Sequence, residues 1–312
     1  MELYLFSGFL GGGKTTTIIA LSKFLMGQGK KVGVVTNDQG KYLVDTAFMK
    51  ANDIPAVDVQ SGCFCSNFQD LVQQLDELKE KVDPDIVFAE SIGSAGNLVG
   101  TVLQPLLQRS SYKPKALVSI VDARLIMRVI NKEYLPFSDS VTATFMNQMI
   151  ESDILIINKI DMVTLNDMDR IISGFPELFG DKAFIFQSAL SATDIKKTYA
   201  HIKALESTVK EDILFDAHLH QKALDRLEWS EEVFELESDA NVKQTIVTLI
   251  EDLLVKHKQH GHIIAHIKVL IENSGKPFKL SISSLDSDEW RDELEEFSSK
   301  KAKVIINSRV QK

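Results

Sequence analysis

A glycine-rich turn near the start of the chain constrains the fold most strongly. Residues 8–15 read Gly-Phe-Leu-Gly-Gly-Gly-Lys-Thr, which fits the pattern G-x-x-x-x-G-K-[ST] of a phosphate-binding loop. A short apolar run at residues 3–6 precedes the turn, and an amphipathic stretch begins near Thr15. Strand, turn and helix in this order place backbone N–H groups and a helix N-terminus around a bound phosphate. The turn therefore predicts a nucleotide-binding α/β domain.

The polar residues of this turn have predicted partners on the nucleotide. We expect Lys14 to reach the β- and γ-phosphates and to stabilise charge during phosphoryl transfer. The hydroxyl of Thr15 is expected to bind Mg²⁺. The other residues of the predicted phosphate site are Gly11, Gly12, Gly13 and Thr16.

Apolar runs alternate with amphipathic stretches up to about residue 215. This alternation predicts a parallel, doubly wound sheet covered by helices on both faces, as in P-loop NTPases. Beyond that point the order of elements reads β-α-β-β-α-β, which matches a small α+β domain of ferredoxin-like type. We therefore expect a P-loop domain over residues 1–215 and a second domain over residues 225–312.

Polar residues follow several of the predicted strands, at the sheet edge where α/β proteins bind ligands. Asp38 comes after the second strand, and Glu90 ends the apolar run at residues 86–89. The loop after Glu90 contains Gly93, where a P-loop protein senses the γ-phosphate. Glu90, Asp38 and Lys14 are our candidate catalytic residues.

Asn158-Lys159-Ile160-Asp161 follows another apolar run. The Asp161 carboxylate can accept hydrogen bonds from N1–H and the 2-amino group of guanine, which adenine does not offer together. Since each charged hydrogen bond is worth about 1.5–3 kcal/mol, two of them discriminate GTP from ATP by roughly a hundredfold. With Ser188 and Ala189 downstream, this stretch predicts guanine specificity. A small-molecule P-loop kinase is the weakest alternative function, because residues 158–161 would then have no base to recognise.

Net charge and hydropathy argue against other classes of protein. The formal net charge of −9 argues against a nucleic-acid binder. The sequence shows neither a leader peptide nor an apolar run of the roughly 18–20 residues that span a bilayer, so we expect a cytoplasmic protein. Its two cysteines, Cys63 and Cys65, are poorly spaced for a disulfide framework, and a reducing compartment would keep them as thiols.

Together these motifs resemble the CobW-type metallochaperone GTPases, relatives of the urease and hydrogenase nickel-insertion GTPases and of the methylmalonyl-CoA mutase chaperone. The resemblance rests on residues 8–16, 62–65, 90–93 and 158–161 and extends to the small C-terminal domain. It implies a GTP–Mg²⁺ switch that delivers a transition metal or guards a metal cofactor. It also implies that Asp38 helps to bind Mg²⁺ or the metal and that Glu90 is a Mg²⁺- or water-linked acid.

The sequence departs from this family at the metal motif. Family members carry Cys-x-Cys-Cys, whereas this chain has serine at the last position, Ser66. A serine hydroxyl is a much weaker ligand than a thiolate for Zn²⁺, Co²⁺ or Ni²⁺. Because Cys63 and Cys65 alone are insufficient, a third ligand would come from Asp38, from a histidine or from a second subunit of a homodimer.

Two further groups of residues are weaker candidates. His257, His260, His262 and His266 lie close together, and the last three share one side of a predicted strand. They offer either a metal site or an exposed polar strand face, of which the second is commoner. No pattern in the sequence assigns Arg109 or Arg124 as an arginine finger.

These observations lead to one main hypothesis and two rivals. We expect a slow GTPase that serves a client metalloenzyme or cofactor-dependent enzyme, with no nucleic-acid or membrane partner. The first rival is a chaperone of a corrinoid or other cofactor enzyme that never binds free metal. The second is a regulatory module in which nucleotide only sets partner affinity.

Overall fold

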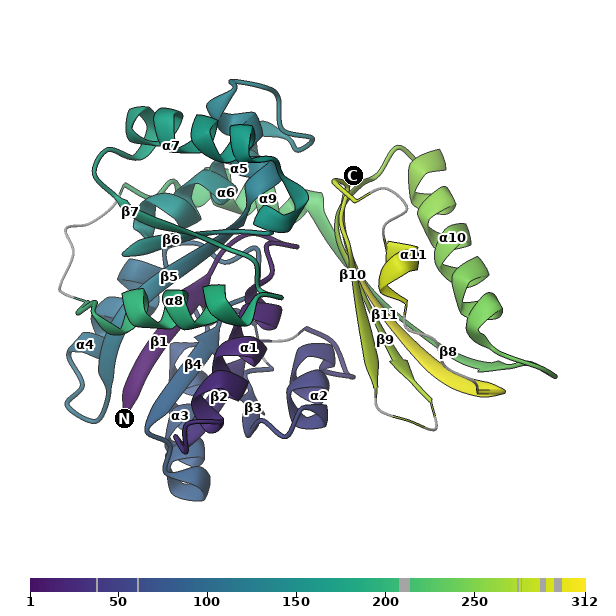
Figure 1. Cartoon of the computed structure of the whole chain (residues 1–312), viewed down its shortest axis with the longest axis horizontal. Helices are drawn as coiled ribbons and strands as arrows, with labels where there is room; N and C mark the ends of the chain where they lie inside the picture. Colours follow the sequence, from purple (N-terminus) through teal and green to yellow (C-terminus); the bar gives the residue numbers. More distant parts are fainter. Residues whose placement is uncertain are drawn as a thin grey trace.

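The computed structural model describes residues 1–37, 39–60, 62–207, 214–273, 275, 277–286, 290–294 and 299–312. Over these residues the chain forms one seven-stranded and one four-stranded sheet, each with its own helices (Figure 1). A search of the same residues for a helix with the length and hydropathy to span a bilayer finds none.

The seven-stranded sheet is parallel throughout, in the order β3-β2-β4-β1-β5-β6-β7. This confirms the predicted α/β fold. Its strands are β1 (Glu2–Ser7), β2 (Val32–Thr36), β3 (Ala56–Asp58), β4 (Ile86–Glu90), β5 (Lys113–Asp122), β6 (Ile154–Asn158) and β7 (Ala183–Gln187).

Helices cover both faces of this sheet. They are α1 (Lys14–Met26), α2 (Val44–Ala51), α3 (Phe68–Val82), η1 (Val99–Leu103), α4 (Gln104–Leu107), α5 (Ala123–Ile130), α6 (Asp139–Glu151), η2 (Ile160–Met162), α7 (Leu165–Phe179), α8 (Ala192–Lys203) and α9 (Ala217–Arg226).

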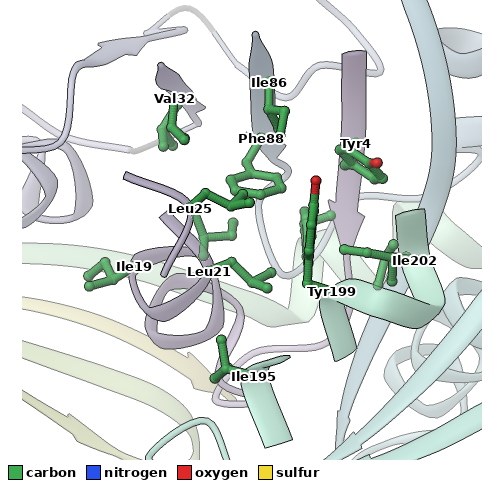
Figure 2. Packing of buried hydrophobic residues seen from close by; sticks show 14 of the residues in the cluster. Tyr4, Ile19, Leu21, Leu25, Val32, Ile86, Phe88, Ile195, Tyr199 and Ile202 are labelled. Carbon is green, nitrogen blue, oxygen red and sulfur yellow. The ribbon is translucent and has the colours of Figure 1, made fainter. Parts of the chain in front are cut away.

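Alternate side chains of β1 explain why both faces are covered. Tyr4 packs against residues of α1 and α8, including Leu21 and Ile202 (Figure 2). Leu3 and Leu5 point the other way and pack with residues of α3. Because side chains alternate along a strand, an apolar residue at every position needs a helix on each side.

The four-stranded sheet is antiparallel, in the order β10-β9-β11-β8. Its elements follow the predicted β-α-β-β-α-β order along the chain. The two central strands of the sheet are β9 and β11, the second and fourth of its strands in chain order. The elements are β8 (Leu227–Glu237), α10 (Lys243–Gln259), β9 (Ile263–Glu272), β10 (Phe278–Ile282), α11 (Trp290–Glu293) and β11 (Lys301–Gln311).

The two faces of the four-stranded sheet have different partners. Ile267, Val269 and Ile271 of β9 pack with the apolar side chains of α10 and α11. The alternate residues His266 and Lys268 lie on the other face, where both line a cavity and Lys268 contacts Asp45 of α2. Figure 1 shows this face of the sheet turned toward the seven-stranded sheet. Of the histidines predicted to share an exposed strand face, His266 is therefore buried, whereas His260 is exposed and His262 lies before β9.

Several sequence predictions fall on residues outside the described ranges. Asp38 is one of them, and residues 208–213 of the expected domain boundary are others. The domain limits therefore stay a prediction.

Candidate nucleotide site

The glycine-rich turn joins β1 to α1 and has the backbone of a tight anion-binding loop. Gly8 and Gly13 have φ angles of 127° and 94°, which side chains disfavour. A Cβ atom on Gly8 would lie 2.2 Å from the main-chain oxygen of Ile120, and one on Gly13 would lie 2.2 Å from Nδ2 of Asn158. Glycine is therefore required at both positions.

Lys14 is buried in this loop. Its Nζ donates to the main-chain oxygens of Gly8 at 2.7 Å and Phe9 at 3.2 Å. Burial lowers the pKa of Lys14 to about 8, against the attraction of Glu90 and Asp45. Phosphate oxygens bound in the loop would give this ammonium group anionic partners in place of neutral carbonyls.

Three side chains with oxygen atoms that could bind a cation meet at the start of α1. The Thr15 hydroxyl oxygen lies 2.8 Å from Oε1 of Glu90 and 3.2 Å from Oδ1 of Asp45. Burial and the charge of Asp45 raise the pKa of Glu90, whose Oε2 is buried without a hydrogen-bond partner among the described residues. A buried hydroxyl and two carboxylates, one of which has an oxygen without a hydrogen-bond partner among the described residues, suit a hard cation such as Mg²⁺.

Asp45 is a residue that the sequence reasoning missed. It lies in the first turn of α2, the helix that follows the β2 loop, and its side chain is buried. The available signal was an acidic residue in the first turn of the helix that follows this loop. Asp38, the residue chosen instead, lies outside the described residues.

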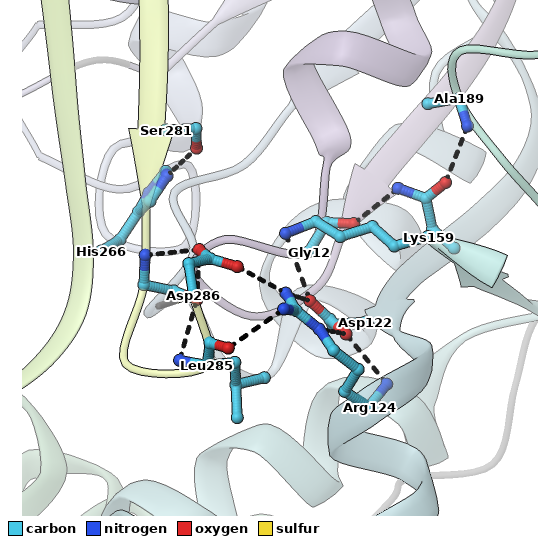
Figure 3. Close-up of polar contacts among 11 residues, drawn as sticks. Gly12, Asp122, Arg124, Lys159, Ala189, His266, Ser281, Leu285 and Asp286 are labelled. Carbon is cyan, nitrogen blue, oxygen red and sulfur yellow. Dashed lines mark hydrogen bonds and ion pairs between the residues drawn. The ribbon is translucent and has the colours of Figure 1, made fainter. Parts of the chain in front are cut away.

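Asn158 brings the predicted base-binding segments to the phosphate loop. Its Nδ2 donates to the main-chain oxygen of Gly12 at 2.9 Å, and its Oδ1 accepts the N–H of Ala189 at 3.0 Å. Lys159, with φ of 62°, extends its Nζ to within 3.2 Å of Asp122 (Figure 3). Asp161 is exposed in the short helix η2. The structure thus joins three segments far apart in sequence.

The loop after β4 packs on the phosphate loop. A Cβ on Gly93 would lie 2.9 Å from the main-chain nitrogen of Leu10, and the Gly93 oxygen accepts from Nε2 of Gln148 at 3.0 Å. The predicted γ-phosphate sensor is therefore held beside the predicted phosphate site.

A cavity of about 290 Å³ lies between the two sheets and contains these groups. Leu10, Lys14, Thr15 and Gly93 line it from the first sheet. Its other wall comes from the four-stranded sheet, through Trp229, His266, Lys268, Lys279, Ser281, Asn307, Ser308 and Arg309. This wall was not predicted from the sequence.

Two lysines of that wall form ion pairs with Asp45. Lys268 of β9 contacts Oδ2 of the carboxylate, and Lys279 of β10 contacts Oδ1. His266 is bonded through Nε2 to the Ser281 hydroxyl at 2.5 Å (Figure 3). Burial and the charges of the two lysines lower the pKa of His266 well below its usual value, so that this ring is neutral near pH 7.

The cysteine loop is connected to the cavity through Asn37, which lines it. Nδ2 of Asn37 donates to the main-chain oxygens of Val59 and Gly62, and Oδ1 accepts the N–H of Phe64 at 3.1 Å. Cys63 and Cys65 are joined as a disulfide, whereas the sequence predicted two thiols. A metal ligand must be a thiolate, so this pair would bind metal only after reduction.

The remaining candidates are not brought to the cavity. In the described part of the chain, no cluster of three or more histidine, cysteine or acidic side chains is arranged to hold a metal. His257 and His262 approach each other at 3.2 Å between their Nδ1 atoms. Arg124 forms ion pairs with Asp122 and Asp286 (Figure 3).

Comparison with known proteins agrees with this geometry. The family model for the CobW/HypB/UreG nucleotide-binding domain matches residues 2–184. The zinc chaperone YeiR of Escherichia coli (strain K12) is 25% identical over 188 residues, which are 58% of this chain and 53% of YeiR. This chain therefore spans about half the length of that relative.

Two further relatives cover more of their own length. The urease accessory protein UreG of Aliarcobacter butzleri is 27% identical over 210 residues, covering 64% of this chain and 96% of UreG. The crystal structure of HypB from Helicobacter pylori in complex with nickel shares the fold, with a TM-score of 0.50 at 16% identity over 67% of this chain and 91% of HypB. By its phosphate loop and by the family model that matches residues 2–184, this chain belongs to the CobW/HypB/UreG family.

Proposed function

We propose that this protein is a GTP-binding and slowly hydrolysing metallochaperone, in which nucleotide state controls delivery of a transition metal or metal cofactor to a client enzyme. The position of Asn158 between the phosphate loop and Ala189 supports guanine binding. The relatives support the metal role, since YeiR is named a zinc chaperone, UreG a urease accessory protein, and HypB was crystallised with nickel.

Hydrolysis would depend on charge stabilisation more than on covalent chemistry. Lys14 and the backbone N–H groups of the loop are placed to bind the phosphates. Thr15, Glu90 and Asp45 are the residues that would hold Mg²⁺, which neutralises phosphate charge when it is bound. Slow turnover without a partner is expected, because a further cationic group from a partner would add to this charge stabilisation.

The contacts of Asn37 carry the proposed coupling to metal. One side chain lines the nucleotide cavity and makes three hydrogen bonds to the segment that bears Cys63 and Cys65. A shift of the β2 loop between the GTP and GDP states would therefore move the cysteine loop. Reduced cysteines would supply two thiolates, and Asp38, a histidine or a second subunit would supply the third ligand.

The test is a competition titration with Zn²⁺, Co²⁺ and Ni²⁺ under reducing conditions, with GDP and with the slowly hydrolysed analogue GMPPNP. We expect metal affinity to differ between the two nucleotides and to be lost in Cys63→Ser/Cys65→Ser. Ser66→Ala is the matched control, because its hydroxyl donates to the main-chain oxygen of Cys63. Equal affinities in both states would refute the coupling, since a ligand without differential affinity shifts no equilibrium.

The serine at position 66, whose hydroxyl donates to the main-chain oxygen of Cys63, favours a second candidate, a chaperone of a cofactor-dependent enzyme that binds no free metal. In that case the reduced protein binds none of the three metals, yet GMPPNP-loaded protein retains a cofactor enzyme that GDP-loaded protein releases. A purely regulatory module would instead keep full cellular function in a Glu90→Ala variant that no longer hydrolyses GTP.

A further inference from the structure

The face of the four-stranded sheet that lines the cavity carries two lysines directed at one carboxylate. Lys268 and Lys279 come from neighbouring strands and each contacts a different oxygen of Asp45. The side chains of Asp45 and Lys279 are 6% and 10% exposed, and that of Lys268 is 21% exposed. Among the described residues that line the cavity, Lys14, Lys268, Lys279 and Arg309 are basic and Asp45, Glu90 and Glu293 are acidic, so positive charge is in excess.

Both lysines line the same cavity as Thr15 and Gly93, the residues predicted to meet Mg²⁺ and the γ-phosphate. Asp45 is 3.2 Å from the Thr15 hydroxyl, so this carboxylate connects the two lysines to the predicted Mg²⁺ ligand. Their charge also reaches Lys14, whose pKa is lowered mainly by burial and further by both lysines. All three ammonium groups border one cavity with Asp45 and Glu90, and a bound anion would reduce the repulsion that these two carboxylates leave.

We propose that Lys268 and Lys279 bind the terminal phosphate of GTP, so that the C-terminal sheet distinguishes GTP from GDP. This inference rests on the proposed guanine nucleotide site. Asp45 has two alternative sets of partners, the two lysines or a Mg²⁺ ion beside Thr15. When the carboxylate turns to the cation, the γ-phosphate, which only GTP supplies, offers both ammonium groups a new anionic partner. Closure of the sheet onto the phosphate loop then depends on nucleotide state.

The first test compares affinities for GMPPNP and GDP, with Mg²⁺ present, in the wild type, Lys268→Gln, Lys279→Gln and the double variant. We expect each substitution to weaken GMPPNP binding about tenfold or more and GDP binding by less than about threefold, because a charge-assisted hydrogen bond to the γ-phosphate is lost. Lys301→Gln is the matched control, since Lys301 lies on the same sheet and pairs with Glu237 at the surface. Equal losses for both nucleotides, or none, would overturn the proposal.

A second measurement uses the wild type alone and does not depend on whether the variants fold. We expect backbone hydrogen exchange in β9 and β10 to be slower with GMPPNP than with GDP, while exchange in α10 is the same with both. Identical exchange in β9 and β10 would also overturn the proposal. If the wild type binds no guanine nucleotide, or if Lys14→Ala does not weaken binding, the proposed function fails first and takes this inference with it. If the wild type binds guanine nucleotide but the lysine variants keep the wild-type ratio of GMPPNP affinity to GDP affinity, this inference alone fails.

Discussion

Asn158 and Gly12 are joined by a hydrogen bond from the side-chain amide to the main-chain oxygen, with a distance of 2.9 Å. The other end of the same amide accepts the N–H of Ala189. One buried side chain thus sets the spacing between the loop predicted to bind phosphates and the loops predicted to bind the base. The close approach of Gly13 to this amide leads to the first prediction.

Gly13→Ala should damage the nucleotide site more than a glycine substitution elsewhere does. The added Cβ would lie 2.2 Å from Nδ2 of Asn158, so either the loop or the amide must move. We expect GDP affinity to fall more than about tenfold, since hydrogen bonds of this kind are worth about 1 kcal/mol each and the loop geometry is lost with them. Isothermal titration with GDP measures the effect.

Gly29→Ala is the control for backbone strain. Gly29 also has a positive φ, 78°, but a Cβ there meets nothing within 4 Å. It should cost about 1–2 kcal/mol of stability through strain alone and leave GDP affinity unchanged. Equal GDP affinities in the two variants would contradict the role of Gly13.

Asp161→Asn should change base specificity. An asparagine amide can donate to the 2-oxo group of xanthine, where the carboxylate accepts from the 2-amino group of guanine. We expect GDP affinity to fall by roughly a hundredfold, which corresponds to two charged hydrogen bonds, and xanthosine diphosphate affinity to rise. Asp169→Asn, on the exposed face of α7, should change neither. A variant that keeps its preference for GDP would remove Asp161 from the base site.

Nucleotide affinity should fall as the pH rises above 8. Burial lowers the pKa of Lys14 to about 8 in the free protein, and a bound phosphate raises it. Binding therefore takes up a proton between these two pKa values, and affinity falls by up to about tenfold per pH unit in that window. Well below pH 8 Lys14 is protonated in both the free and the nucleotide-bound protein, so its titration no longer changes the affinity.

Titration calorimetry in two buffers of different ionisation enthalpy measures the proton uptake directly. Lys14→Ala is the control, because it retains every other titrating group, including guanine itself. If the wild type and this variant show parallel pH profiles, Lys14 is not the titrating group.

Asp286→Asn should loosen the contact between the two sheets. Arg124, at the start of α5, pairs with Asp122 at 2.7 Å and with Asp286 at 2.8 Å, and the Asp286 side chain is only 10% exposed (Figure 3). Loss of a partly buried charged hydrogen bond should lower the free energy of unfolding by about 1–3 kcal/mol. Urea unfolding followed by circular dichroism measures this change.

Glu177→Gln is the comparison for a surface ion pair. Glu177 and Lys132 lie 3.0 Å apart with 68% and 74% of their side chains exposed, so the substitution should cost less than about 1 kcal/mol. An equal cost for both variants would mean that the Arg124 network does not stabilise the chain beyond a surface pair.

The first sheet and its edge could be predicted because the relevant signals are local. Apolar runs with glycine or polar ends define parallel strands, and parallel strands bring their carboxyl ends to one edge. Lys14, Glu90 and Asn158 each end or follow such a run, which is why the sequence could place them together.

The second wall of the cavity could not be predicted in the same way. Alternation along β9 shows that His266 and Lys268 share a face, but it does not show what covers that face. The ion pairs of Asp45 with Lys268 and Lys279 join residues more than two hundred positions apart, and only the packing of one sheet on the other creates them. The pairing of Cys63 with Cys65 likewise depends on a loop conformation that their spacing does not specify.

Trp229 of β8 lines the cavity, and a Cβ on Gly40 would lie 2.7 Å from its ring. The chain has one other tryptophan, Trp290, which begins α11 and is buried in the core between the helices and the four-stranded sheet. The emission of Trp290 should therefore stay constant while that of Trp229 responds to any movement of the β2–α2 loop. The protein carries its own optical probe, so that the opening and closing of the cavity can be followed in real time without a label.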